Sequence, residues 1–193
     1  MRIIRGNFKG HKLLFLNSKI TRPLKDQAKE GLFNIIEHSN LIKIRIKNSN
    51  ILDLYSGIGS FGLECISREA KEVSFIEDDK NALKLLQHNV NLINKKKVKN
   101  SDFTINIFQQ SVEAFFDKIE HSAKYDFFFF DPPFNDDKFF YNLEKLKKTR
   151  VYDKEHLIII HRDVKSSDKL DKLIDIIIVR KYGRSKIIFG TFN

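Results

Sequence analysis

Four consecutive phenylalanines, residues 127–130, constrain the fold of this chain more than any other feature of its sequence. A run of large apolar side chains without polar alternation is typical of a strand covered on both faces, as in a parallel sheet between helices. Asp131, Pro132 and Pro133 follow directly. Because the prolines lack a backbone N–H and fix their own φ angle, the strand must end at Asp131. We therefore expect Asp131 and Phe134 at the carboxyl end of a buried strand, where open α/β sheets bind ligands.

Strand-like and helix-like segments alternate over most of the chain. Strand patterns occur at 51–54, 73–77, 103–108, 127–130 and 157–161, separated by helical patterns at 60–68, 79–92, 111–119 and 137–147. This alternation predicts βαβ units and an α/β fold with a doubly wound, mainly parallel sheet. Two β-rich runs joined by Gly183-Arg184-Ser185 predict a C-terminal β-hairpin. Residues 2–16 predict a short N-terminal β-hairpin, and a helix is expected after Pro23.

The composition favours a globular domain with a polyanionic partner. The 193 residues are 41% hydrophobic and 31% charged, and no apolar run approaches the roughly 18 residues of a membrane span. The N-terminus lacks the apolar stretch of a signal peptide, and the single cysteine, Cys65, permits no internal disulfide, so a cytoplasmic location is expected. The formal net charge of +10 favours nucleic acid; the alternative is a solvated basic surface without a specific partner.

A glycine-rich turn follows the strand predicted at 51–54. Gly57, Gly59 and Gly62 have the G-x-G-x-x-G spacing of a loop that binds a nucleotide cofactor at the start of a helix. Glu77 ends the next predicted strand, where an acid can bind ribose hydroxyls. Nicotinamide and S-adenosylmethionine (AdoMet) enzymes both need these features. Asp53 favours AdoMet, because a carboxylate suits the ligand's ammonium group and repels a pyrophosphate.

The tetrapeptide 131–134 suits methyl transfer to an exocyclic amino group of a base, whose nitrogen is a poor nucleophile. The Asp131 carboxylate and the Pro132 carbonyl can accept its two N–H bonds and stabilise the positive charge that develops on the nitrogen. Pro133 keeps both acceptors rigid, and Phe134 offers a face on which a flipped-out base can stack. An enzyme that transfers hydride has no need of this arrangement, so the tetrapeptide also favours AdoMet.

Longer stretches of the chain resemble the RsmD-type guanine-N2 methyltransferases of bacterial small-subunit ribosomal RNA. The stretches are MRIIRGNFKGHKL, TRPLKDQAKEGLFNII, DLYSGIGSFGLECISREA, FIEDD, DPPF and KYGRSKIIF. The resemblance implies a Rossmann-like class I methyltransferase fold with a seven-stranded sheet and AdoMet as methyl donor. It also implies that the acceptor is the N2 of one guanine of 16S ribosomal RNA, guanine 966 in the family, within an assembling small subunit.

The motifs and the resemblance together assign residues to three roles. The cofactor residues are Asp53, Tyr55, Gly57, Gly59, Glu77, Asp78, Ser111, Val112 and Asp131. The catalytic residues are Asp131, Pro132, Pro133 and Phe134. The residues expected to grip RNA phosphates are Arg2, Arg5, Lys9, Arg22 and Lys29. We expect residues 1–22 to form an RNA-contacting extension and residues 23–193 the methyltransferase domain, in a monomer without a bound metal.

Four places depart from the family's usual pattern: Arg5, Leu24-Lys25, Ser111 and Ile160-His161-Arg162, where an acid usually follows the fifth strand. Two alternatives to RNA methylation remain. DNA adenine-N6 or protein-glutamine methylation uses similar chemistry, although a protein substrate more often goes with asparagine in place of Asp131, and the chain lacks room for the target-recognition domain of many DNA enzymes. A catalytically silent RNA-binding assembly factor is the alternative of a different class.

Overall fold

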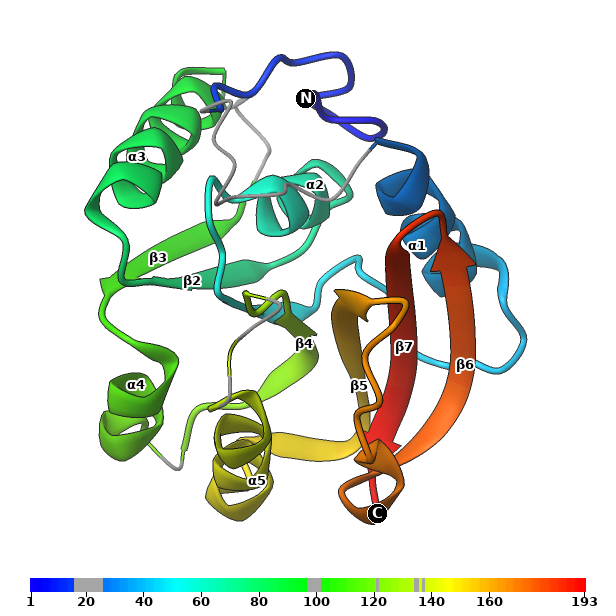
Figure 1. The fold of residues 1–193 in the computed structure, drawn as a ribbon. Helices are drawn as coiled ribbons and strands as arrows, with labels where there is room; N and C mark the ends of the chain where they lie inside the picture. The colour runs from blue at the N-terminus through cyan, green and yellow to red at the C-terminus, as the bar shows by residue number, and fades with distance from the viewer. Residues whose placement is uncertain (16–25, 97–101, 121, 134–135, 137) are drawn as a thin grey trace.

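The computed structural model describes residues 1–15, 26–96, 102–120, 122–133, 136 and 138–193. Seven strands form one sheet in the order β3-β2-β1-β4-β5-β7-β6 (Figure 1). The strands are β1 Asn50–Leu54, β2 Glu72–Glu77, β3 Thr104–Gln109, β4 Tyr125–Phe130, β5 Tyr152–Asp163, β6 Ile174–Tyr182 and β7 Ser185–Phe192. The helices are α1 Asp26–His38, α2 Ser60–Ser67, α3 Lys80–Lys95, α4 Val112–Lys118 and α5 Phe139–Thr149, with a 3-10 turn η1 at Leu170–Lys172.

The sheet has the predicted doubly wound topology. Strands β1 to β5 pair in parallel, whereas β7 runs antiparallel to both β5 and β6. The β6–β7 hairpin turns at Gly183, whose φ of 58° is one that glycine adopts without strain. The Rossmann-like methyltransferase fold and the C-terminal hairpin predicted from the sequence are therefore confirmed.

The four phenylalanines of β4 lie at the centre of the sheet and are buried on both faces. Phe127 and Phe129 pack into the apolar core beneath α1, α2 and α3, while Phe128 and Phe130 pack into the core beneath α4 and α5 (Figure 1). The ring of Phe129 stacks on that of Phe61 in α2, with 4.1 Å between centroids. Since successive side chains of a strand point to opposite faces, the unbroken apolar run supplies both cores at once.

The register of β4 places the strand ends that carry the candidate site side by side. Leu54 is opposite Ile76 of β2 on one side and Phe130 of β4 on the other. Asp53, Glu77 and Asp131 consequently lie at the carboxyl edge of three neighbouring strands.

The N-terminal segment differs from the predicted hairpin. Within residues 1–15, the structure has a single antiparallel bridge between Arg2 and Lys12 and no strand. The segment folds back on itself there, with the N–H of Ile3 donating to the carbonyl of His11 at 2.9 Å. The backbone N–H groups of Ile4 and Arg5 donate to the Glu64 carboxylate at 2.7 and 3.0 Å. The predicted hairpin is thus present only as a short antiparallel bridge, and α2, about 60 residues away in sequence, anchors the segment through Glu64.

Other helix and strand ends differ from their predicted positions by a few residues. Strand β5 already begins at Tyr152, five residues before the predicted start, and α3 continues to Lys95. Residues 16–25, which include the predicted start of the first helix, lie outside the described residues. Within the described part of the chain, no helix is long and apolar enough to cross a membrane.

Candidate active site

The loop between β1 and α2 has an unusual backbone. Tyr55, Gly57 and Gly59 all have positive φ angles, of 59°, 56° and 81°. A Cβ added to Gly59 would lie 2.5 Å from Cδ1 of Leu86, so another residue here would also displace the Leu86 side chain. A Cβ on Gly57 would meet no atom within 4 Å, which leaves this side of the loop open. The glycines predicted from the sequence thus form a tight turn with one accessible side.

Glu77 at the end of β2 joins this loop to the next one. Its Oε2 accepts the N–H of Gly57 at 2.6 Å, and its Oε1 accepts the N–H groups of Asp78 and Asp79 at 3.0 and 2.9 Å. Burial raises the pKa of Glu77, and the three N–H donors oppose that shift. Glu77 therefore fixes the first loop, and its Oε2, which accepts a single N–H, keeps a lone pair for a further donor.

Asp53 in β1 is a buried carboxylate, with 1% of its surface exposed. Its Oδ2 accepts the N–H of Gly62 in α2 at 2.9 Å, and its Oδ1 has no hydrogen-bond partner among the described residues. Burial raises the pKa of Asp53 well above its usual range, and the charges of Asp131 and Glu77 push it in the same direction. A buried carboxylate held in this way would gain from a neighbouring cationic ligand.

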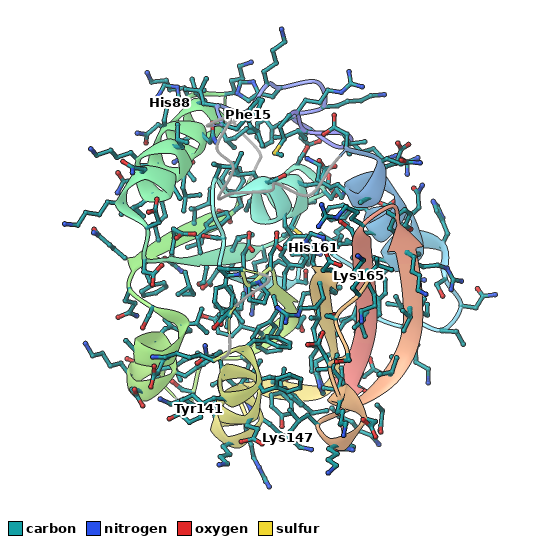
Figure 2. All side chains as sticks on the ribbon, in the orientation of Figure 1. Phe15, His88, Tyr141, Lys147, His161 and Lys165 are labelled. Carbon is teal, nitrogen blue, oxygen red and sulfur yellow. The ribbon has the colours of Figure 1, made fainter. Side chains whose placement is uncertain are left out.

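Asp131 directly follows β4, at the same edge of the sheet as these two acids. Its Oδ1 lies 2.7 Å from Nδ1 of His161, and 23% of its side chain is exposed. Pro132 is buried, and the carbonyl of Pro133 accepts a hydrogen bond from Nη1 of Arg162 at 3.3 Å. Figure 2 labels His161 at the upper end of β5. The two residues of β5 therefore hold the start of the predicted catalytic tetrapeptide, whereas Phe134 lies outside the described residues.

Several residues of this edge were missed by the sequence reasoning. Asn142 of α5 donates from Nδ2 to the hydroxyl of Tyr55 at 2.8 Å, and its own Oδ1 has no partner among the described residues. The hydroxyl of Ser56 is likewise buried without a partner in the described part of the chain. A signal for Asn142 was present, because it lies on the apolar face of its helix with Phe139, Leu143 and Leu146. Such buried polar atoms need partners, so they support a polar ligand at this edge.

The remaining predicted cofactor residues lie at the ends of β2 and β3. Asp78 is exposed beside Glu77. Ser111 is the N-cap of α4, with its Oγ accepting the N–H of Ala114 at 3.2 Å, and Val112 is buried as the first residue of that helix. The structure thus gives Ser111 a role in helix capping. A contact between a cofactor and Asp78, Ser111 or Val112 stays a prediction.

One of the residues predicted to bind RNA is wrongly assigned. The side chain of Lys29 in α1 has no exposed surface, and its Nζ donates to the carbonyl of Arg2 at 2.7 Å and to Oγ of Ser60 at 3.3 Å. The same Nζ lies 3.7 Å from Oε2 of Glu64. Burial lowers the pKa of Lys29, with the charge of Glu64 acting in the opposite direction. Lys29 is therefore a structural partner of Glu64 in the core and cannot grip a phosphate in this structure.

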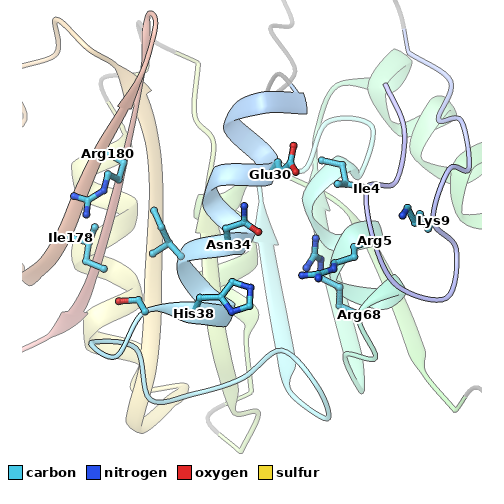
Figure 3. Close-up of a pocket in the computed structure, with 11 residues that line it drawn as sticks. Ile4, Arg5, Lys9, Glu30, Asn34, His38, Arg68, Ile178 and Arg180 are labelled. Atoms are coloured by element: carbon cyan, nitrogen blue, oxygen red, sulfur yellow. The ribbon is translucent and has the colours of Figure 1, made fainter.

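Other predicted RNA contacts lie near a groove on the α1 side of the molecule. The groove has a volume of about 720 Å³ between the N-terminal segment, α1, the end of α2 and β6 (Figure 3). Its cationic residues are Arg5, Lys9, Arg68 and Arg180. Arg5 and Arg68 both pair with Glu37, the Arg5 contact at 2.7 Å, so their charges are partly compensated. Arg2 is exposed, and Arg22 lies outside the described residues.

Comparison with known proteins identifies the family. The family described as conserved hypothetical protein 95 matches residues 1–191. The chain belongs to this family. A relative from Haemophilus influenzae, ribosomal RNA small subunit methyltransferase D, is 36% identical over 135 residues, which cover 70% of this chain and 64% of that protein. The match thus spans slightly less than two thirds of the Haemophilus protein.

Two further relatives cover more of the chain. A protein of the same name from Buchnera aphidicola subsp. Baizongia pistaciae is 30% identical over 174 residues, which cover 90% of this chain and 80% of the relative. The solved structure of the Escherichia coli protein yhhF, named as a methyltransferase, superimposes with a TM-score of 0.80 and 22% identity over 100% of this chain and 98% of its own. The resemblance of this chain to RsmD-type methyltransferases, which its sequence motifs indicated, is thereby confirmed.

The buried position of Lys29 predicts a large loss of stability on substitution. Lys29→Met should lower the free energy of unfolding by about 3 kcal/mol, because removal of one partner leaves the buried Glu64 charge less compensated. Lys9→Met, at an exposed position, is the matched control and should change stability by less than about 0.5 kcal/mol. Urea unfolding measures both. Equal stability of the two variants would contradict the structural role of Lys29.

Proposed function

We propose that the protein transfers a methyl group from AdoMet to the exocyclic N2 of a guanine in 16S ribosomal RNA. The observation that carries the proposal is the placement of Asp131-Pro132 beside the buried acids Asp53 and Glu77 in a methyltransferase fold. Family members named ribosomal RNA small subunit methyltransferases support RNA as the acceptor. We further propose that the target is guanine 966, the position expected for the family. The substrate would be an assembling small subunit in the cytoplasm.

The carboxyl edge of the sheet fits AdoMet. The sulfonium and ammonium groups of AdoMet are cationic. The buried Oδ1 of Asp53, which has no partner among the described residues, could accept a hydrogen bond from the ammonium group. The open side of the loop at Gly57 allows a ligand to approach the backbone, and Oε2 of Glu77 has a lone pair left for a ribose hydroxyl. Ser111 and Val112 lie at the end of β3, where the adenine would be held. When bound, AdoMet supplies an electrophilic methyl group.

Asp131 and Pro132 would hold the acceptor nitrogen. Oδ1 of Asp131 is engaged by His161, whereas Oδ2 accepts no hydrogen bond from the described residues. Oδ2 and the carbonyl of Pro132 would accept the two N–H bonds of the guanine amino group and stabilise the positive charge that develops on nitrogen. We also propose that Phe134 stacks on the flipped-out base. The chain therefore contributes mainly positioning and electrostatic stabilisation.

The N-terminal segment would bind RNA through its exposed cations. Arg2 and Lys9 are exposed, Arg5 lies in the groove of Figure 3, and the chain has a net charge of +10. These groups would contact phosphates, which gives affinity without sequence specificity. The segment is also anchored to α2, since Ile4 and Arg5 bind Glu64, so RNA held there has a fixed position relative to the cofactor loop.

Asp53→Asn tests the cofactor site. The variant should bind AdoMet about tenfold or more weakly, because a charge-assisted contact contributes about 1.5–3 kcal/mol. It should also be more stable at neutral pH, since the raised pKa of Asp53 means that its ionised form is unfavourable in the folded state. This gain should shrink as the pH falls through the folded-state pKa and wild-type Asp53 takes up a proton.

Calorimetry with AdoMet and urea unfolding at several pH values measure these effects. Asp175→Asn, at an exposed position in β6 near the opposite edge of the sheet, is the matched control and should change neither property appreciably. Wild-type affinity of Asp53→Asn for AdoMet would contradict the assignment.

Asp131→Ala tests the acceptor site. The variant should bind AdoMet nearly as wild type does but transfer methyl at least about a hundredfold more slowly, since it loses a preorganised electrostatic partner of the transition state. Asp131→Asn keeps an oxygen acceptor without the charge and should give an intermediate rate. Single-turnover kinetics on under-methylated small subunits at saturating AdoMet measure the step. An Asp131→Ala enzyme with the parental rate would rule out this mechanism.

Charge neutralisation tests the RNA surface. Arg2→Gln and Lys9→Gln together should reduce the salt slope of RNA binding by about one unit for each lost phosphate contact. Lys154→Gln and Lys172→Gln, exposed near the amino ends of β5 and β6, form the matched control and should leave the slope unchanged. Binding titrations over a range of salt concentrations give both slopes. Identical slopes for the two double variants would show that the N-terminal cations do not contact RNA.

A further inference from the structure

His161 links three strands at the candidate site. Its Nδ1 lies 2.7 Å from Oδ1 of Asp131 at the end of β4, and its Nε2 lies 2.8 Å from Oγ of Ser185 at the start of β7. Because Phe130 pairs with Ile160, the next residues along both strands, Asp131 and His161, are neighbours by register. The His161 side chain is buried, with 3% of its surface exposed. Its ring is therefore held from both sides in a fixed orientation.

We propose that His161 is a positioning residue for methyl transfer, which directs the Asp131 carboxylate toward the acceptor amino group. The inference rests on the proposed function. In the neutral ring, the Ser185 hydroxyl donates to Nε2, so the ring proton is on Nδ1 and is donated to Oδ1 of Asp131. This contact leaves Oδ2 for the guanine N–H.

The main charges that act on His161 come from two strands. Asp131 after β4 raises the pKa of the imidazole, and of the charged groups in β5 itself, Arg162 lowers it and Asp163 raises it, while Ser185 brings no charge from β7. Arg162 is paired with Asp168 at 3.1 Å, and Asp163 with Arg184 at 3.4 Å. Asp131 is thus the direct ionic partner of the imidazole.

The protonation state of His161 should control the reaction. Burial lowers the pKa of His161, but the charge of Asp131 and the hydrogen bond to it outweigh this effect and raise the pKa above its ordinary value. With neutral His161, the pair has a net charge of −1 and stabilises the positive charge on the acceptor nitrogen. With protonated His161 the pair is neutral, and that stabilisation is weakened. The rate of methyl transfer should therefore fall as the pH drops through the raised pKa.

Stability should show the opposite dependence on pH. A group whose pKa is raised on folding contributes stability that is fully present below its unfolded-state pKa and is lost as the pH rises through its folded-state pKa. The protein should accordingly be most stabilised by this pair under the acidic conditions in which it transfers methyl most slowly. If activity were lost at low pH because the protein unfolds, stability would fall together with the rate. Measuring stability across the pH range therefore separates unfolding from protonation of His161 as the cause.

Three variants test the proposal by single-turnover kinetics on under-methylated small subunits across the pH range. His161→Leu should lower the rate by about tenfold to a hundredfold with AdoMet affinity unchanged, because a small displacement of a reacting group costs this much. His161→Asn can still donate to Asp131 but does not titrate, so it should recover most of the rate at high pH and lose the pH dependence. His156→Asn is the control, since His156 is also buried in β5 but bonds to the backbone of Asp153 and Phe192.

The pair itself has a readout that does not depend on activity. The pKa of His161, measured by NMR in the wild-type protein, should fall in Asp131→Asn and stay unchanged in Asp175→Asn. A His161 pKa that is insensitive to Asp131, or a His161→Leu enzyme with the parental rate and pH profile, would overturn the role of His161 alone. Absence of methyl transfer by the wild-type protein on every RNA substrate would instead overturn the proposed function, and the role of His161 with it.

Discussion

The site depends on the convergence of carboxylates at the ends of three adjacent parallel strands. The apolar β4 strand lies at the centre of the sheet and is followed directly by Asp131, beside β1 with Asp53 and one strand away from β2 with Glu77. Each acid has a defined structural partner: the N–H of Gly62 for Asp53, three loop N–H groups for Glu77 and the imidazole of His161 for Asp131. Burial and mutual repulsion make the ionised form of Asp53 unfavourable, and a cationic ligand would offset that cost.

Two charged networks connect this edge to the rest of the molecule. On one side, His161 and Arg162 of β5 bind Asp131 and the Pro133 carbonyl, so the antiparallel end of the sheet supports the proposed catalytic tetrapeptide. On the other side, the Glu64 carboxylate binds two N–H groups of the N-terminal segment and the buried Lys29, which also reaches the first residue of α2. A segment proposed to bind RNA is thereby fixed to the helix that follows the cofactor loop.

The sequence predicted those features that depend on local pattern, and it missed those that depend on contacts between distant elements. The apolar run at 127–130 and the glycine loop identify a strand and a turn by themselves, so β4 and the β1–α2 loop were predicted correctly. Lys29 was assigned to RNA by its charge, although Glu64, 35 positions further along the chain, keeps it in the core. The contact between Asp131 and His161 could not be predicted either, because only the folded sheet brings β4 beside β5, and β7 with Ser185 beside His161.

The central claim is that this edge methylates the amino group of a guanine in small-subunit RNA. The most direct measurement supplies AdoMet with a labelled methyl group to the wild-type protein together with under-methylated small subunits, naked 16S RNA, DNA and protein, and then identifies the labelled product by mass spectrometry. The account predicts N2-methylguanosine in 16S RNA, with label in neither the DNA nor the protein. Label recovered as N6-methyladenine in DNA or as methylglutamine in protein, with none in RNA, would contradict it.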